Sequence, residues 1–117
     1  MKTVKLKSQW GCEYEVMFTL NNYLNNDNLY VGLMCFDTEF NAWVPYADIT
    51  VNTDTVLNGN RAAVDTNNNG QEIVGWLLEN GFATDDDFEM PVVSGFCVYP
   101  VLKFDLIKIK EYLYDGR

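Results

Sequence analysis

The sequence predicts an α+β fold, with a mainly antiparallel, curved sheet of about five or six strands and one central helix at about residues 70–80. Two observations predict it. Several short stretches alternate apolar and polar residues with a period of two, which is typical of strands with one buried face. One stretch has apolar residues at helical spacing instead. Because 117 residues can bury one core, we expect a single domain over residues 1–117.

The N-terminal half is expected to supply most of the strands. Residues 2–8 and 14–20 both alternate, and together they predict a first hairpin. The asparagine-rich stretch 21–28 predicts a loop, because asparagine tolerates left-handed backbone and bonds its own main chain. Residues 29–36 are apolar on both faces, as expected for a central strand.

Further strands are predicted along the rest of the chain. Residues 43–51 should return as the next strand, with Pro45 at its start or on an unpaired side, because proline cannot donate to a ladder. Residues 61–66 fit a short strand. Residues 94–106 fit a long strand that is interrupted near Pro100.

The clearest helical pattern covers residues 70–81. Gly81 stands where a glycine ends many helices. The apolar face of this helix consists of Ile73, Val74, Trp76, Leu77 and Leu78. The pattern therefore predicts an amphipathic helix that packs its apolar face on the sheet.

The C-terminal stretch 106–114 fits two structures. Ile109 belongs to a helical stripe when it is counted with the leucines on either side of it. It belongs to a strand when it is counted with Ile107, since isoleucines then alternate with lysines. We favour a short helix that begins near Asp105.

The charge of the chain is negative and unevenly distributed. The net charge is −9, and Arg61 is the only basic residue between Ser8 and Leu102. Such a chain repels nucleic-acid phosphates and anionic membranes, so we expect direct binding to neither. The acidic middle is either a solubility feature or a face for a basic protein partner.

The cysteines and the apolar runs predict a cytoplasmic protein. Cys12, Cys35 and Cys97 are widely spaced and form no C-x-x-C motif, so we expect three reduced thiols. No apolar run has the length of a signal peptide or of a membrane span.

The string DTNNNG resembles the first half of a calcium-binding EF-hand loop. Asp65, Asn67 and Asn69 fill the first, third and fifth ligand positions, and Gly70 fills the sixth. The twelfth position, however, holds Trp76 in place of the bidentate glutamate, which leaves only a weak candidate site. Asp and Asn just before a helix also cap its free amides. We therefore predict a capped strand-to-helix turn, with no metal and no other cofactor.

The residue types present exclude several kinds of catalysis. The chain has no histidine, which removes Ser-His-Asp and Cys-His nucleophiles and histidine-ligated zinc. It has neither G-x-G-x-x-G nor a phosphate-binding loop. Paired carboxylates remain available, and Asp37, Glu39 and Asp48 around the central hairpin are the candidates. We lean towards a protein that is not an enzyme.

Three stretches carry a resemblance to a known family. They are "NLYVGLMCFDTEFNAWVPYADITVN" (28–52), "AAVDTNN" (62–68) and "SGFCVYPVLKFDL" (94–106). In these the chain resembles a small bacterial family of unknown function, whose short acidic members occur largely in Gram-positive bacteria and their mobile elements. The resemblance implies no activity. It implies that DTNN is part of a structural signature, and it favours an accessory role in gene exchange or host defence.

The candidate ligand or partner surface combines acids and aromatics. Its members are Asp37, Glu39, Trp43, Tyr46, Asp48, Asp85, Asp86 and Asp87. Our first hypothesis is a non-enzymatic module that offers this surface to a protein with a basic surface, including the version in which carboxylates imitate DNA phosphates.

The second hypothesis is a small-ligand-binding protein or a carboxylate-dependent enzyme. It predicts a pocket between the sheet and the 70–81 helix that holds Trp43 or Tyr46 with Asp37 or Asp48. Under either hypothesis, free sheet edges leave pairing with a second copy open.

Overall fold

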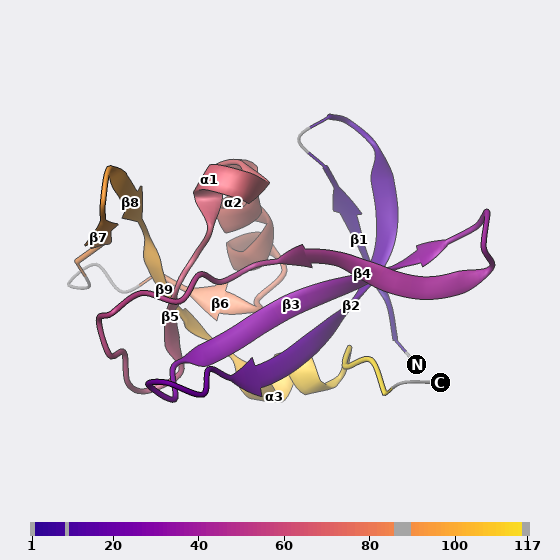
Figure 1. Ribbon diagram of the computed structural model, residues 1–117. Helices are drawn as coiled ribbons and strands as arrows, with labels where there is room; N and C mark the ends of the chain where they lie inside the picture. The colour runs from indigo at the N-terminus through magenta and orange to yellow at the C-terminus, as the bar shows by residue number, and fades with distance from the viewer. Residues whose placement is uncertain (1, 9, 86–89, 116–117) are drawn as a thin grey trace.

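A computed structural model describes residues 2–8, 10–85 and 90–115, and within these ranges the strands form three antiparallel sheets (Figure 1). The strands are β1 (Val4–Lys7), β2 (Glu13–Asn22), β3 (Leu29–Asp37), β4 (Ala42–Asp48), β5 (Arg61–Ala63), β6 (Ala83–Thr84), β7 (Val92–Ser94), β8 (Cys97–Tyr99) and β9 (Val101–Phe104). The helices are α1 (Thr66–Asn69), α2 (Glu72–Glu79) and α3 (Leu106–Lys110). The predicted α+β class is therefore confirmed in broad terms.

The largest sheet has four strands in the order β1-β2-β3-β4, and each strand pairs with its neighbour in sequence. Both predicted hairpins are present. Residues 23–28 of the asparagine-rich stretch form the connection between β2 and β3, whereas Asn21 and Asn22, predicted as loop, are the last residues of β2. Pro45 lies opposite Met34, next to a register shift in the β3–β4 ladder. A proline is tolerated there because its missing N–H interrupts no regular pairing.

The single sheet of five or six strands predicted above differs from the observed arrangement. After β4 the chain leaves the first sheet, and β5 pairs with β9 in a separate three-stranded sheet of order β5-β9-β6. In the stretch 94–106 the predicted interruption is confirmed, because Pro100 separates β8 from β9. The two parts do not continue one strand, however, because β8 pairs with β7 and β9 pairs with β5 and β6. Gly95 has a φ of 60°, and this backbone conformation allows the chain to reverse between β7 and β8.

The helical region is divided, whereas one central helix was predicted. Gly70, with φ 82° and ψ 163°, separates α1 from α2. The end of α2 agrees with the prediction: Gly81 has a φ of 74°, and its N–H donates to Leu78 O (3.2 Å). Phe82 N–H donates to Leu77 O (3.0 Å), which completes a Schellman motif.

The predicted C-terminal helix is confirmed as α3. Asp105 caps it, because its carboxylate accepts the N–H of Lys108 at 3.0 Å. None of the helices in the described ranges is long and apolar enough to cross a membrane.

One hydrophobic core joins the four-stranded sheet, the β5-β9-β6 sheet, α2 and α3. Phe18 of β2 lies at its centre and is fully buried. Its ring is 4.7 Å from that of Phe82 and 6.0 Å from that of Trp76, measured between centroids. The apolar face predicted for α2 thus packs on the sheet, with Ile73 and Leu77 buried.

Candidate functional site

The four-stranded sheet divides at one end. The β2–β3 pairing runs from Asn22↔Leu29 only as far as Val16↔Cys35. Beyond this point β2 pairs with β1 alone and β3 pairs with β4 alone. In Figure 1 the β1–β2 hairpin accordingly rises to the top while the β3–β4 hairpin runs to the right. The two inner strand edges are left without a neighbouring strand in the described part of the chain.

A hollow of about 400 Å³ occupies this division, and its lining is acidic. We call it the acidic fork. It is lined by Glu13, Tyr14, Glu15, Cys35, Phe36, Asp37 and Thr38. Three of these seven residues are carboxylates and none is basic. Glu13 lies 3.8 Å from the Nζ of Lys5, but both side chains are largely exposed, so this ion pair is weak.

Of the predicted surface residues, Asp37 lies in the acidic fork and Glu39 lies in the adjacent turn. The Asp37 carboxylate accepts the N–H groups of Glu39 (2.8 Å) and Phe40 (3.2 Å). It therefore stabilises the turn and also contributes charge to the fork. Trp43 is half-buried on β4 and packs edge-on against Phe36, with 5.6 Å between ring centroids.

Asp48 does not join these residues. It pairs with Gly32 at one end of the β3–β4 ladder, whereas Asp37 pairs with Ala42 at the other. Gly32 and Asp37 are five positions apart on β3, or roughly 17 Å, so Asp37 and Asp48 form no catalytic pair. Asp85 is exposed beyond β6, and Asp86 and Asp87 lie outside the described residues.

Asp48 instead accepts a hydrogen bond from the hydroxyl of Tyr30 at 2.7 Å. Burial and this bond to Asp48 raise the pKa of Tyr30 from 10.0 to about 12. The raised pKa means that the folded protein holds the Tyr30 proton over a pH range in which the unfolded chain releases it.

This difference predicts a pH dependence of stability. The contribution of Tyr30 is complete below pH 10, and it should be lost as the pH rises from 10 towards 12. The Tyr30→Phe variant has no such proton, so its free energy of unfolding should fall less between pH 9 and 11. Urea unfolding of both proteins at the two pH values measures the difference. An equal fall in both would contradict the assignment.

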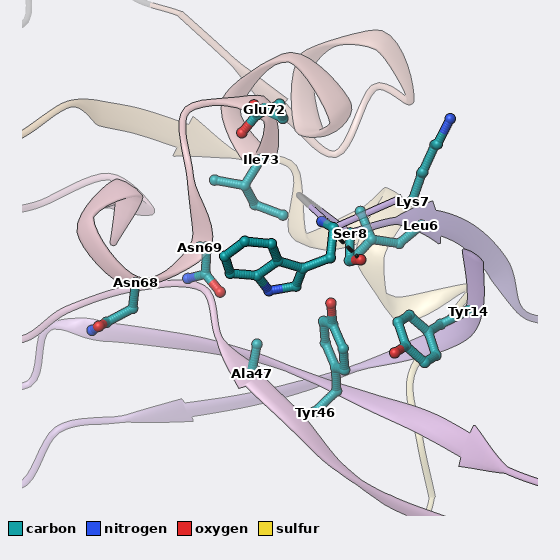
Figure 2. Close-up of a pocket in the computed structure, with 11 residues that line it drawn as sticks. Leu6, Lys7, Ser8, Tyr14, Tyr46, Ala47, Asn68, Asn69, Glu72 and Ile73 are labelled. Carbon is teal, nitrogen blue, oxygen red and sulfur yellow. Dashed lines mark hydrogen bonds between the residues drawn. The ribbon is translucent and has the colours of Figure 1, made fainter. Parts of the chain in front are cut away.

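A second pocket, of about 260 Å³, lies between the sheet and the helices (Figure 2). We call it the aromatic pocket. It is lined by Leu6, Lys7, Ser8, Trp10, Tyr14, Tyr46, Ala47, Asn68, Asn69, Glu72 and Ile73. A pocket between sheet and helix that holds Tyr46 was predicted. Its carboxylate is Glu72, however, and neither Asp37, Asp48 nor Trp43 lines it.

Hydrogen bonds between distant segments hold the walls of the aromatic pocket. Trp76 Nε1 of α2 donates to the backbone oxygen of Lys5 in β1 at 2.8 Å. Asn69 Nδ2 donates to Asp48 O at 2.8 Å and so ties α1 to the end of β4. The sheet and both helices therefore keep their spacing around the pocket.

The DTNNNG string forms the predicted capped turn. The Asp65 carboxylate is buried and accepts the N–H (3.1 Å) and the Nδ2 (2.8 Å) of Asn68. Asn67 is exposed, and Asn69 Nδ2 also donates to the backbone oxygen of Asp65 at 2.9 Å. These groups stabilise the start of α1, which is a separate short helix and not α2. The described residues contain no cluster of three or more acidic or cysteine side chains suited to a metal ion.

The fold and the two hollows define a small, acidic α+β protein with one carboxylate-lined and one aromatic concavity. The chain belongs to the family of the domain of unknown function DUF4313, whose signature matches residues 17–117. No curated protein matches the chain. No solved structure matches it.

Three carboxylates of these sites were absent from the predicted surface: Glu13 and Glu15 in the fork and Glu72 in the aromatic pocket. The alternating string EYE was the available signal for the fork, because residues two apart on a strand share a face. No local pattern indicates that β2 and β3 part beyond Val16.

Proposed function

We propose that the chain is a non-enzymatic protein-interaction module, and that the acidic fork receives an extended, basic segment of a partner protein. The observation that carries this proposal is the lining of the fork, which contains three carboxylates and no basic residue. Lysine or arginine side chains are the groups that such a lining favours.

The strand edges supply the second part of the argument. An extended peptide can add to a sheet edge through main-chain hydrogen bonds, with its side chains giving specificity. The fork offers the inner edges of β2 and β3, which have no neighbouring strand there in the described chain. The net charge of −9 adds a long-range attraction for a basic partner.

The competing explanation is that the acids only keep the protein soluble. A test must therefore separate charge at the fork from total charge. The fork variant is Glu13→Gln, Glu15→Gln and Asp37→Asn, in which the new amide at position 37 retains an oxygen for the turn N–H groups. The matched control is Asp54→Asn, Glu79→Gln and Asp85→Asn, whose parent side chains are exposed and lie outside the fork. Each variant removes three negative charges, so −9 becomes −6 in both.

The probe is a hexapeptide of alternating lysine and valine, titrated into each protein by calorimetry at low salt. Three exposed charge pairs at about 0.5 kcal/mol each predict that the fork variant binds about ten-fold more weakly than the parent. The control variant should stay within about two-fold of the parent. Equal weakening of both variants would show that only total charge matters, and would contradict the proposal.

In the DNA-mimic version of this proposal, the carboxylates imitate DNA phosphates and the partner is a nucleic-acid-binding protein. Duplex DNA should then compete with the chain for that partner. The resemblance to proteins of Gram-positive bacteria and their mobile elements favours this version, since an accessory role in gene exchange would bring such partners within reach. Simultaneous binding of DNA and the chain would contradict mimicry.

A further inference from the structure

The aromatic pocket collects three aromatic side chains from different parts of the chain. Trp10 comes from the β1–β2 turn, Tyr14 from β2 and Tyr46 from β4. The rings of Tyr14 and Tyr46 lie 5.1 Å apart at an angle of 47°. Glu72, in the first turn of α2, adds a carboxylate to the same lining. Aromatic faces beside a carboxylate attract a positively charged group.

We propose that the aromatic pocket binds a small organic cation of the alkylammonium class. The faces of aromatic rings carry negative potential, and an alkylated ammonium group combines positive charge with an apolar surface that can contact them. The pocket volume of about 260 Å³ is below the usual range of drug-sized sites, so the ligand is a small headgroup.

The charged groups around the pocket favour a cation. Glu72 and Lys7 are the charged side chains in its lining. Figure 2 shows the amine of Lys7 directed away from the space between Tyr46 and Ile73, while Tyr46 points its hydroxyl into that space. Tyr46 is an uncharged phenol at neutral pH, and burial raises its pKa further above the ordinary value. The net charge of −9 acts in the same direction.

Hydrogen bonds to Ser8 position the backbone of Trp10 and Cys12. Ser8 Oγ accepts the N–H groups of Trp10 (3.3 Å) and Cys12 (3.2 Å). Ser8 N–H donates to Cys12 O at 2.7 Å, and Gly11 supplies a φ of 88°. Trp10 itself is 83% exposed, so its indole has surface available for a ligand. Such preorganisation lowers the entropy cost of binding.

Aromatic pockets also bind neutral apolar molecules and sugars, so the test must isolate the charge. Choline and its neutral isostere 3,3-dimethyl-1-butanol differ in the replacement of the ammonium nitrogen by carbon. We expect calorimetry to give a dissociation constant for choline of about 1 mM or below, and binding of the isostere at least about ten-fold weaker. Equal affinities for choline and the isostere would overturn the proposal. So would the absence of choline binding at 50 mM, which is about fifty-fold above the expected dissociation constant.

Two variants locate the site. Trp10→Ala should weaken choline binding about ten-fold and Glu72→Gln about three-fold, because each removes one attractive group. The matched controls are Phe40→Ala, an exposed aromatic in another turn, and Glu79→Gln, an exposed acid on the same helix; both should bind choline like the parent. Because Trp10 and Glu72 are exposed, none of these changes threatens folding. Parent-like binding by Trp10→Ala would overturn the proposal.

This inference goes beyond the proposed function and can fail separately from it. The fork variant retains Trp10, Tyr14, Tyr46 and Glu72, so it should bind choline like the parent. Conversely, Glu72→Gln should bind the lysine–valine peptide like the parent. Loss of choline binding in the fork variant would contradict the assignment of the cation to the aromatic pocket.

Discussion

Replacing Phe18 with alanine is expected to lower the free energy of unfolding by about 3–5 kcal/mol. Phe18 is fully buried, and its ring contacts those of Trp76 and Phe82 where β2, α2 and the segment after α2 meet. Removing the ring leaves a cavity that the surrounding rigid aromatic groups cannot fill. Urea unfolding followed by circular dichroism measures the loss.

The control for this prediction is Phe40→Ala. Phe40 is 74% exposed in the β3–β4 turn, so its removal should change stability by no more than about 0.5 kcal/mol. If the two variants lost the same stability, Phe18 would not lie at the centre of the core.

Replacing Asn28 with alanine is expected to cost about 2–3 kcal/mol. Asn28 is 4% exposed and joins two loops: its Nδ2 donates to Thr55 O (2.9 Å) and its Oδ1 accepts Leu57 N–H (3.0 Å). Alanine would leave both backbone groups without these partners in a partly buried place, which costs more than the loss of the bonds alone.

The same unfolding measurement tests Asn28, with Asn58→Ala as its control. Asn58 is exposed in the loop before β5, and the described contacts involve only its backbone oxygen. The control should therefore lie within about 0.5 kcal/mol of the parent. A loss for Asn28→Ala as small as for the control would show that the two loops do not depend on this side chain.

The local features of the fold were predictable because their causes are local. The α3 cap follows from Asp105 before an apolar run, and the end of α2 follows from Gly81. The sequence predicted that Asp65 caps a helix, which is correct, but it placed this cap before the 70–81 helix, whereas Asp65 caps α1. A positive φ at Gly70, which splits α1 from α2, leaves no signature in apolar periodicity.

The pairing of distant strands could not be predicted in this way. β5 and β9 are separated by about forty residues, and no local pattern in these two short strands distinguishes their mutual pairing from addition to the edge of β4. The division between β2 and β3 has the same origin, because β2 keeps its alternation on the far side of Val16 and β3 stays apolar past Cys35 to Phe36. Both candidate sites depend on such long-range geometry. The sequence therefore indicated Asp37, an acidic surface and a pocket that holds Tyr46, but it did not reveal the fork or the carboxylate of that pocket, Glu72.

The central claim is that a basic segment binds in the acidic fork. The most direct measurement is the change in backbone amide NMR signals when the lysine–valine hexapeptide is added to the ¹⁵N-labelled protein. We predict that the largest changes occur at Glu13–Glu15 and at Phe36, Asp37 and Thr38. At a peptide concentration near the parent's dissociation constant, these changes should be several-fold smaller in the fork variant and should persist in the matched control. Changes of equal size at Asp54, Glu79 and Asp85, or changes in the fork variant as large as in the parent, would contradict the account.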